Sequence, residues 1–180
     1  MKKFIGSLIL CALSLPAFAV NAQQVAKVYG SLGYTSLNFK GGDGVPDFKN
    51  GALEFALGAR HPENVAIELV FGGGVKDDKK TVEGSRVQFE TKHYYGIYLK
   101  PYVMMSDRIE LYGKLGYIKG KATLRGPGGS VTASDGDFSY GIGAAFHVEK
   151  DAAITLDYTR ISDDKDGKID GVGVAIRFNF

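Results

Sequence analysis

The chain has 180 residues, and its 22 lysines and arginines against 20 aspartates and glutamates give a formal net charge of +2 at pH 7. So small a charge gives no global reason to expect nucleic acid as a partner. The length suits one domain, and glycine is abundant, with 25 residues, whereas proline is scarce, with 5.

The beginning of the chain has the order of a secretory signal peptide. A basic start at Lys2 and Lys3 is followed by a short apolar run and then by small residues up to Ala22. The apolar run is shorter than the roughly 20 residues that cross a bilayer, which argues against the alternative of an N-terminal anchor helix. We therefore expect cleavage after Ala22.

Cleavage there would divide the chain into a signal peptide of residues 1–22 and a domain of residues 23–180. Cys11 is the single cysteine and would leave with the signal peptide. We therefore expect no disulfide, no thiol nucleophile and no cysteine metal site in the mature chain.

Eight later segments alternate apolar residues with small or polar ones. Successive side chains of a strand point to opposite faces, so each segment predicts a strand with one apolar face. In the last segment the apolar set is Val174, Ile176, Phe178 and Phe180. The eight segments are residues 27–35, 52–60, 65–73, 93–103, 109–117, 138–148, 153–159 and 173–180.

Short and long connections alternate between these segments. Three are tight, near Pro62, near Asp107 and after Glu149, and four are longer and polar: residues 40–51, 76–85, 125–136 and 162–168. This layout predicts an all-β fold, an eight-stranded antiparallel up-and-down transmembrane β-barrel, with long loops extracellular and both termini periplasmic. The fourth segment, extended back to about Val87, is longer than a membrane needs, so we expect an exposed sheet above the surface.

A soluble β-sandwich or a lipocalin-like barrel is the alternative fold. In either, the apolar faces would line a core and the other faces would meet solvent. The polar faces here are crowded with glycine, alanine, serine and tyrosine. A narrow lumen needs small residues, whereas a solvent face does not, so the membrane barrel is favoured.

The inward positions carry charges of both signs. Because an unpaired buried charge is very costly, these side chains must pair with one another in a lumen only wide enough for side chains. We therefore expect a plugged interior lined with tyrosine, without an open channel and without an apolar lumen for hydrophobic cargo. The predicted network is Lys27, Glu54, Arg60, Glu68, Glu90, Lys92, Lys100, Glu110, Lys114, Asp157 and Arg177.

Catalytic and metal-binding residues are not apparent. A hydrolase would need serine, histidine and a carboxylate together, and His61, His93 and His147 show no such partners in the predicted arrangement. The segment from residue 163 resembles part of a calcium loop, but Ser162 and Gly173 stand where that loop needs Asp and Glu. We expect no catalytic residue, no metal and no cofactor.

One predicted loop carries a basic patch of Lys119, Lys121 and Arg125 before the letters "GPGG". The patch could contact lipopolysaccharide phosphates or acidic host glycans. The alternative is that these are solvated charges that keep a loop soluble.

The stretches "LKPYVMMSDRIELYGKLGYIKGKA", "DFSYGIGAAFHVEKDAAITLDYTRI" and "GVGVAIRFNF" resemble the small outer-membrane β-barrel family, often described as porin-family barrels. That family includes the outer-membrane protein A barrel, outer-membrane protein X, the Ail-type attachment proteins and the opacity proteins. The likeness covers essentially the whole predicted domain and is weakest in the loops. It implies that Ile176, Phe178 and Phe180 form the signal read by the barrel-assembly machinery.

The resemblance also implies a non-enzymatic role in adhesion, immune evasion or envelope integrity at the cell surface. The implied partners are outer-membrane lipid and lipopolysaccharide, the barrel-assembly machinery and host surface or serum proteins, with the barrel a monomer. The alternatives are a narrow porin-like channel and a lipid A-modifying enzyme.

Overall fold

The computed structural model describes residues 27–41, 47–82, 85–164 and 167–180, so the predicted signal peptide of residues 1–22 lies outside the described part. No helix in these ranges is long and apolar enough to span a membrane. The described strands are β1 Lys27–Gly41, β2 Phe48–His61, β3 Val65–Lys76, β4 Asp78–Val82, β5 Ser85–Met104, β6 Ile109–Gly126, β7 Gly129–Glu149, β8 Ala152–Asp164 and β9 Gly167–Asn179.

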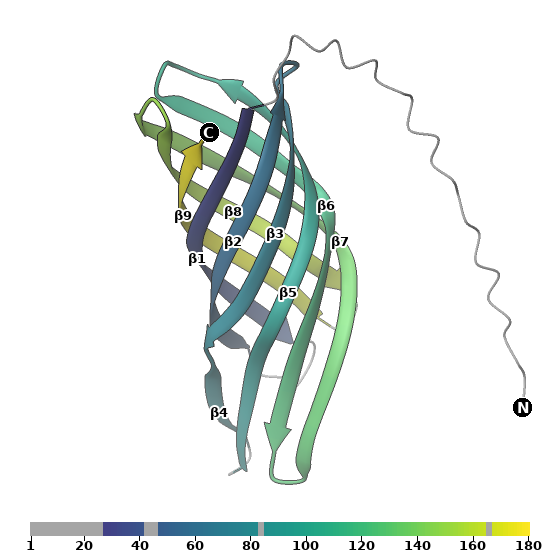
Figure 1. Ribbon diagram of the computed structural model, residues 1–180. Helices are drawn as coiled ribbons and strands as arrows, with labels where there is room; N and C mark the ends of the chain where they lie inside the picture. Colours follow the sequence, from purple (N-terminus) through teal and green to yellow (C-terminus); the bar gives the residue numbers. More distant parts are fainter. Residues whose placement is uncertain (1–26, 42–46, 83–84, 165–166) are drawn as a thin grey trace, which may run out of the picture.

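One antiparallel sheet runs in the order β3-β2-β1-β9-β8-β7-β6-β5-β4 and closes because β3 also pairs with β5. The closed ring therefore has eight strands, with β4 as a short addition along β5 (Figure 1). Closure gives both edge strands a hydrogen-bonding partner. The hydrocarbon of a bilayer requires this because it offers the backbone no hydrogen bonds of its own. The predicted eight-stranded antiparallel barrel is confirmed.

The outside of the barrel is apolar. Leu32, Leu57, Ile97 and Leu156, for example, are exposed although each sits in the middle of a strand. Four tyrosines face outward as well: Tyr34, Tyr117, Tyr140 and Tyr158. Such a surface would aggregate in water, and it suits a lipid environment.

The two ends of the barrel differ, and we call them the turn end and the loop end. At the turn end, tight connections follow His61, Met104 and Glu149, as predicted, and Asn64 takes a left-handed conformation with φ 59°. The first strand begins and the last strand ends at this end as well (Figure 1).

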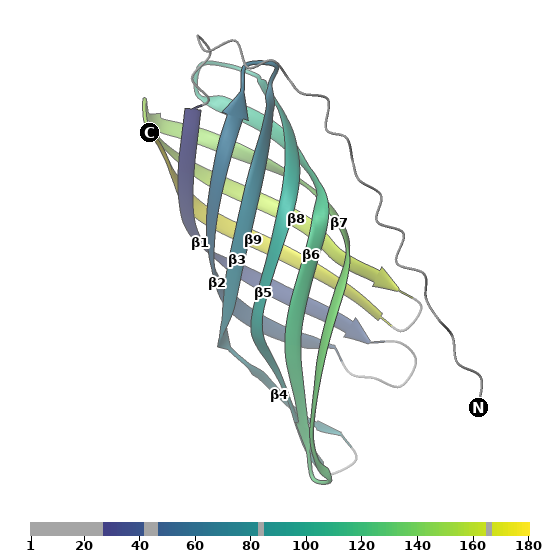
Figure 2. The same cartoon turned by 45° about the vertical axis from the view of Figure 1, so that its right-hand side comes forward.

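At the loop end, β5, β6 and β7 run far past their neighbours and form an exposed sheet with β4, which we call the loop-end sheet (Figure 2). The exposed sheet was expected, but the prediction of a long loop over residues 125–136 is wrong. Instead β6 and β7 pair up to Gly126 and Gly129, where Gly129 has φ 130°. A glycine tolerates that angle, and so the hairpin turns tightly.

Inside the barrel, tyrosines lie directly opposite glycines on neighbouring strands. The four cross-strand pairs are Tyr29 with Gly58, Tyr94 with Gly72, Tyr98 with Gly116 and Tyr112 with Gly143. A Cβ atom added to any of these glycines would lie within 2.7 Å of the paired ring. The glycines thus make the room in which the tyrosine rings fill the lumen.

We predict that Gly116→Ala strongly destabilises the barrel. The new Cβ would lie 2.0 Å from the carbonyl oxygen of Ile97 and 2.7 Å from the Tyr98 ring, so the backbone must shift. Overpacking of this kind costs about 1–3 kcal/mol or more. Urea unfolding in detergent, followed by circular dichroism, measures the loss.

Gly113→Ala on the same strand is the matched control. Its Cβ would meet Pro101 at 3.6 Å, an ordinary contact on the outer face. Equal unfolding midpoints for the two variants would contradict the assignment of Gly116 as the closely packed position.

Candidate functional site

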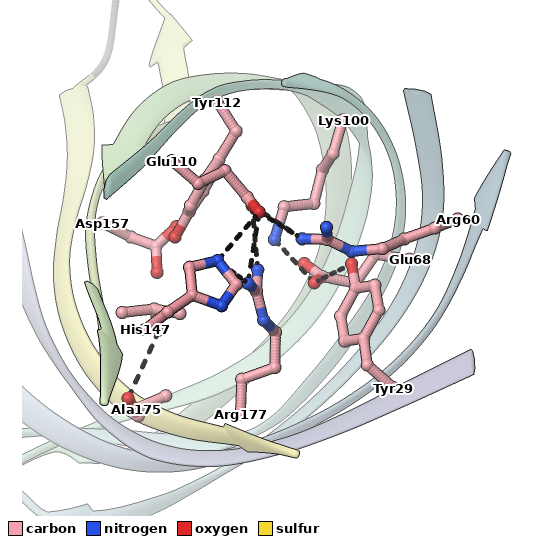
Figure 3. Close-up of polar contacts among 11 residues, drawn as sticks. Tyr29, Arg60, Glu68, Lys100, Glu110, Tyr112, His147, Asp157, Ala175 and Arg177 are labelled. Atoms are coloured by element: carbon pink, nitrogen blue, oxygen red, sulfur yellow. Dashed lines mark hydrogen bonds and ion pairs between the residues drawn. The ribbon is translucent and has the colours of Figure 1, made fainter. Parts of the chain in front are cut away.

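The lumen next to the turn end contains a carboxylate bound by two guanidinium groups. Glu110 of β6 is 1% exposed and accepts hydrogen bonds from Arg177 at 3.0 and 3.3 Å and from Arg60 at 2.7 and 2.6 Å. His147 Nε2 lies 3.4 Å from the same carboxylate (Figure 3). Side chains from three other strands, β2, β7 and β9, therefore converge on Glu110.

A second cluster lies deeper in the barrel around Glu68 of β3. The Tyr29 hydroxyl and the Lys100 ammonium each donate to Glu68 Oε2 at 2.7 Å. Lys114 lies 3.9 Å from Glu68 and 3.6 Å from Asp157, and so joins the two carboxylates. Figure 3 shows Tyr29, Glu68 and Lys100 pointing into the lumen from separate strands.

Tyrosine rings fill the space between these ions. The Lys100 ammonium lies 4.2 Å from the centre of the Tyr112 ring, and the Lys114 ammonium lies 4.7 Å from that of Tyr98. The Tyr112 hydroxyl donates to Asp157 at 2.9 Å. Each buried cation thus has a ring face as well as a carboxylate to compensate for lost water.

A third carboxylate, Glu54, lies nearest the middle of the barrel and accepts a 2.8 Å hydrogen bond from the Tyr94 hydroxyl. Beside it, the hydroxyls of Tyr98 and Ser139 are 2.9 Å apart. Four carboxylates of this part of the lumen, Glu54, Glu68, Glu110 and Asp157, lie among four cations, Arg60, Lys100, Lys114 and Arg177. Carboxyl groups and cations are therefore equal in number here.

These eight residues belong to the network predicted from the sequence, but three predicted members lie elsewhere. Lys27 is exposed at the start of β1. Glu90 and Lys92 pair with each other, and Glu90 also lies 3.4 Å from Arg125, on the loop-end sheet. A bulge in β5 between Thr91 and His93 shifts the alternation by one residue, which the sequence pattern did not reveal.

His147 is the residue that the predicted network omitted. The alternation along residues 138–148 already indicates that the His147 side chain points into the lumen. Its contact with Glu110, however, depends on the register between β6 and β7. The structure also shows a group of apolar side chains lining the loop half of the lumen, contrary to the expectation of a lumen without apolar lining. Leu37, Phe48 and Ile118 are buried there.

The basic patch lies on the outward face of the loop-end sheet. Lys119, Lys121 and Arg125 share one side of β6 and are exposed. The hydrogen bond from Lys92 lowers the pKa of Glu90, so this neighbouring carboxyl is charged at neutral pH. The patch keeps an excess of positive charge, and Glu90 lies 3.4 Å from its Arg125.

The three residues of the expected assembly signal all face outward. Ile176 and Phe178 lie on the lipid face of β9, and Phe180 is 82% exposed while its amide donates to the Val28 carbonyl at 2.8 Å. Their recognition by an assembly machinery stays a prediction. Within the described ranges, no group of three or more metal-ligating side chains could hold an ion.

Known proteins share this architecture. A family model described as outer membrane protein beta-barrel domain matches residues 5–180. The crystal structure of Ail, the attachment invasion locus protein of Yersinia pestis, is 21% identical over 87% of this chain and 100% of that chain, with a TM-score of 0.61. A second Ail structure, in complex with the heparin analogue sucrose octasulfate, is 20% identical over the same shares, also with a TM-score of 0.61.

Neisserial surface protein A is 10% identical over 85% of this chain and 97% of that chain, with a TM-score of 0.66. At such identities these likenesses concern the fold alone. A search of curated proteins finds no match.

We predict that Glu110→Gln destabilises the barrel by about 3–5 kcal/mol, because it leaves two buried guanidinium groups without their counter-charge. The free energy of unfolding in urea, measured in detergent, tests this. Glu149→Gln, an exposed change at the turn end of β7, is the control and should leave the midpoint unchanged. A Glu110→Gln midpoint equal to that of the control would contradict the central role of Glu110.

Proposed function

The chain belongs to the outer membrane protein beta-barrel domain family, and from that membership we propose that it is a non-enzymatic barrel that serves envelope structure and surface interaction. The observation that carries the proposal is the charge-paired interior. Four carboxylates and four cations occupy the turn half of the lumen. A barrel filled in this way leaves its outer surface and its loop-end sheet as the places where it can act.

We propose the following topology. Residues 1–22 are a signal peptide, residues 23–180 form the barrel, the turn end faces the periplasm and the loop end faces outward. Ile176, Phe178 and Phe180 present a row of apolar side chains to the barrel-assembly machinery during insertion. The barrel acts as a monomer, because closure leaves no unpaired strand edge within the membrane.

The lumen is proposed to be sealed. Tyr29, Tyr98 and Tyr112 pack against the ion pairs, and each is buried. Ions crossing the barrel would have to displace these rings and break buried ion pairs at a cost of several kcal/mol each. A narrow porin-like channel is the competing function, and conductance separates the two.

We therefore expect the purified barrel to show no stable conductance in planar bilayers. A general porin treated in the same way is the positive control for incorporation. Stable single-channel steps that persist in several independent preparations would overturn the sealed lumen and favour the channel.

The basic patch is proposed to bind polyanions. Along a strand each residue adds about 3.4 Å, so Lys119 lies about 7 Å beyond the outward-facing Tyr117 and Arg125 about 27 Å beyond it. We propose that Lys119 and Lys121 lie at the level of lipopolysaccharide phosphates. Arg125 reaches farther, toward acidic glycans of a host surface, and the Ail complex makes a heparin analogue a suitable probe.

A lipid A-modifying enzyme is the remaining alternative. His147 lies against Glu110 and Arg177 in the sealed turn half, away from any lipid headgroup at the loop end. We propose that none of the histidines is catalytic. Lipid A mass spectra of cells with and without the protein should be identical, and a new or missing acyl or phosphate group would contradict this proposal.

We predict that the triple variant Lys119→Gln, Lys121→Gln, Arg125→Gln binds immobilised heparin at least tenfold more weakly than the parent. Three charges on one strand face act together on a polyanion, and salt should weaken the parent more than the variant. Surface plasmon resonance on the barrel in lipid nanodiscs measures both effects.

The matched control is Lys49→Gln, Lys76→Gln, Lys79→Gln, which removes the same charge from exposed positions on β2, β3 and β4. If the control weakens heparin binding as much as the patch variant does, net charge rather than the patch is responsible.

A further inference from the structure

A cavity of about 500 Å³ lies at the loop end of the lumen, and none of the eight charged residues of the turn half lines it. Its volume falls within the range of small-molecule sites, which often occupy the mouths of β-barrels. The apolar side chains that line it are Leu37, Phe39, Phe48, Phe89, Ile118, Leu124, Ile161 and Ile169.

Three phenylalanine rings form an aromatic wall on one side of this cavity. The ring centres of Phe39 and Phe89 are 4.3 Å apart, and those of Phe48 and Phe89 are 5.5 Å apart. Phe48 is almost fully buried, so the wall is held in place by packing. A ligand would find this apolar surface already formed and would not have to order it.

Two carboxyl groups, those of Asp135 and Asp137, face the same cavity from β7. Ser139 lies on the same strand and is fully buried in the lumen. Because β7 pairs with β6 without a bulge in this stretch, every second residue before Ser139 lies on the same inner face. The cross-strand partners of the two aspartates, Gly120 and Ile118, line the cavity as well.

Neither aspartate has a cation as a partner in the described part of the chain. Asp135 accepts the amide of Gly136 at 2.8 Å, and Asp137 accepts the amide of Phe138 at 2.6 Å. An ionised carboxyl group can accept about four hydrogen bonds, so one amide leaves most of this capacity unused. The two side chains thus bring negative charge to an apolar cavity.

The basic side chains near the cavity point away from it. Lys40 lies on the outer face of β1, where its ammonium is 3.5 Å from Asp170. Lys168, Lys121 and His93 also alternate to the outer faces of their strands. Among the described residues, the charges on the cavity side are therefore the two carboxylates, and they favour a positively charged ligand.

We propose that this cavity binds a hydrophobic organic cation, an ammonium group attached to an apolar chain. The ammonium lies at Asp135 and Asp137, and the apolar chain lies against Phe39, Phe48 and Phe89. The aromatic faces suit a cation of this kind, because they attract positive charge as well as apolar carbon.

This site is independent of the basic patch, which lies on the opposite face of the loop-end sheet. A polyanion on that patch and a cation in the cavity would bind to different sides of β6. The proposal therefore stands or fails separately from heparin binding.

The chain contains no tryptophan, so one introduced tryptophan reports on a single place. Phe39→Trp puts the reporter in the cavity wall, and Leu57→Trp puts it on the lipid face of β2. The probes are (ω-bromoundecyl)trimethylammonium, ω-bromoundecanol and ω-bromoundecanoate, which share one chain and differ in the charge of the head. Their bromine quenches tryptophan fluorescence.

The barrels are reconstituted in nanodiscs of zwitterionic lipid and titrated with each probe. We expect saturable quenching of Phe39→Trp by the ammonium probe, and only unsaturable quenching of Leu57→Trp, which comes from partitioning into the bilayer. The ammonium probe should bind severalfold more tightly than the alcohol, and the carboxylate probe more weakly than the alcohol.

The double variant Asp135→Asn, Asp137→Asn tests the head group in the Phe39→Trp background. Asparagine keeps the side-chain oxygen that accepts the backbone amide but removes the charge, so the ammonium and alcohol probes should bind equally. Asp107→Asn, Glu149→Gln removes the same two charges from exposed positions at the turn end and should keep the preference for the cation.

Gly120→Leu tests the cavity itself. A Cβ at Gly120 meets only the Tyr94 Cβ at 3.6 Å and the His93 carbonyl at 3.9 Å, so the larger side chain can extend into the empty space. In the Phe39→Trp background it should weaken the binding of all three probes, because it removes space and leaves the charge unchanged.

Folding of each variant is checked by the gel shift between unheated and heated samples. If Phe39→Trp does not fold, Leu124→Trp, which also lines the cavity, replaces it. Quenching of the cavity reporter that matches the Leu57→Trp line, or that Gly120→Leu leaves unchanged, would overturn the site.

Three results would overturn the cationic head group. They are equal affinities of the parent reporter for the ammonium and alcohol probes, a preference for the ammonium probe that the double aspartate variant retains, and loss of that preference in the turn-end control.

Discussion

The hydrogen bonds of the backbone impose the constraint on which the rest of this structure depends. In hydrocarbon every peptide N–H and C=O needs a partner within the protein, and the pairing of β3 with β5 supplies the last of them by closing the sheet. Closure with eight strands fixes a narrow lumen. The tyrosine–glycine pairs follow from that width, since a ring on one strand can lie inside only where its neighbour has no side chain.

The narrow lumen also dictates how charge is arranged within it. Ions buried among tyrosine rings are tolerable only in pairs, and Glu110 and Glu68 each gather cations from several strands. The same links cross the barrel and hold its walls together. Toward the loop end, apolar side chains such as Leu37, Phe89 and Ile118 line a cavity.

The loop-end sheet has two chemically different faces. Because side chains alternate along β6, Lys121 and Arg125 face outward while Leu124 faces the cavity. One strand therefore carries positive charge on one side and an apolar side chain on the other. Rigid pairing of β6 with β7 keeps both faces in place, which a free loop could not do.

The sequence by itself determined the strand number, the lipid-facing residues and eight of the eleven charges expected in the lumen, because a period of two is a local property of the chain. Only the tertiary structure decided the features that depend on how neighbouring strands are aligned. The bulge beside Thr91 moved Glu90 and Lys92 out of the lumen, and pairing turned residues 125–136 from a loop into a hairpin. The sequence did not predict the apolar cavity, because Leu37 and Phe89 lie outside the clearly alternating segments. They line one cavity only because distant strands are aligned in the barrel.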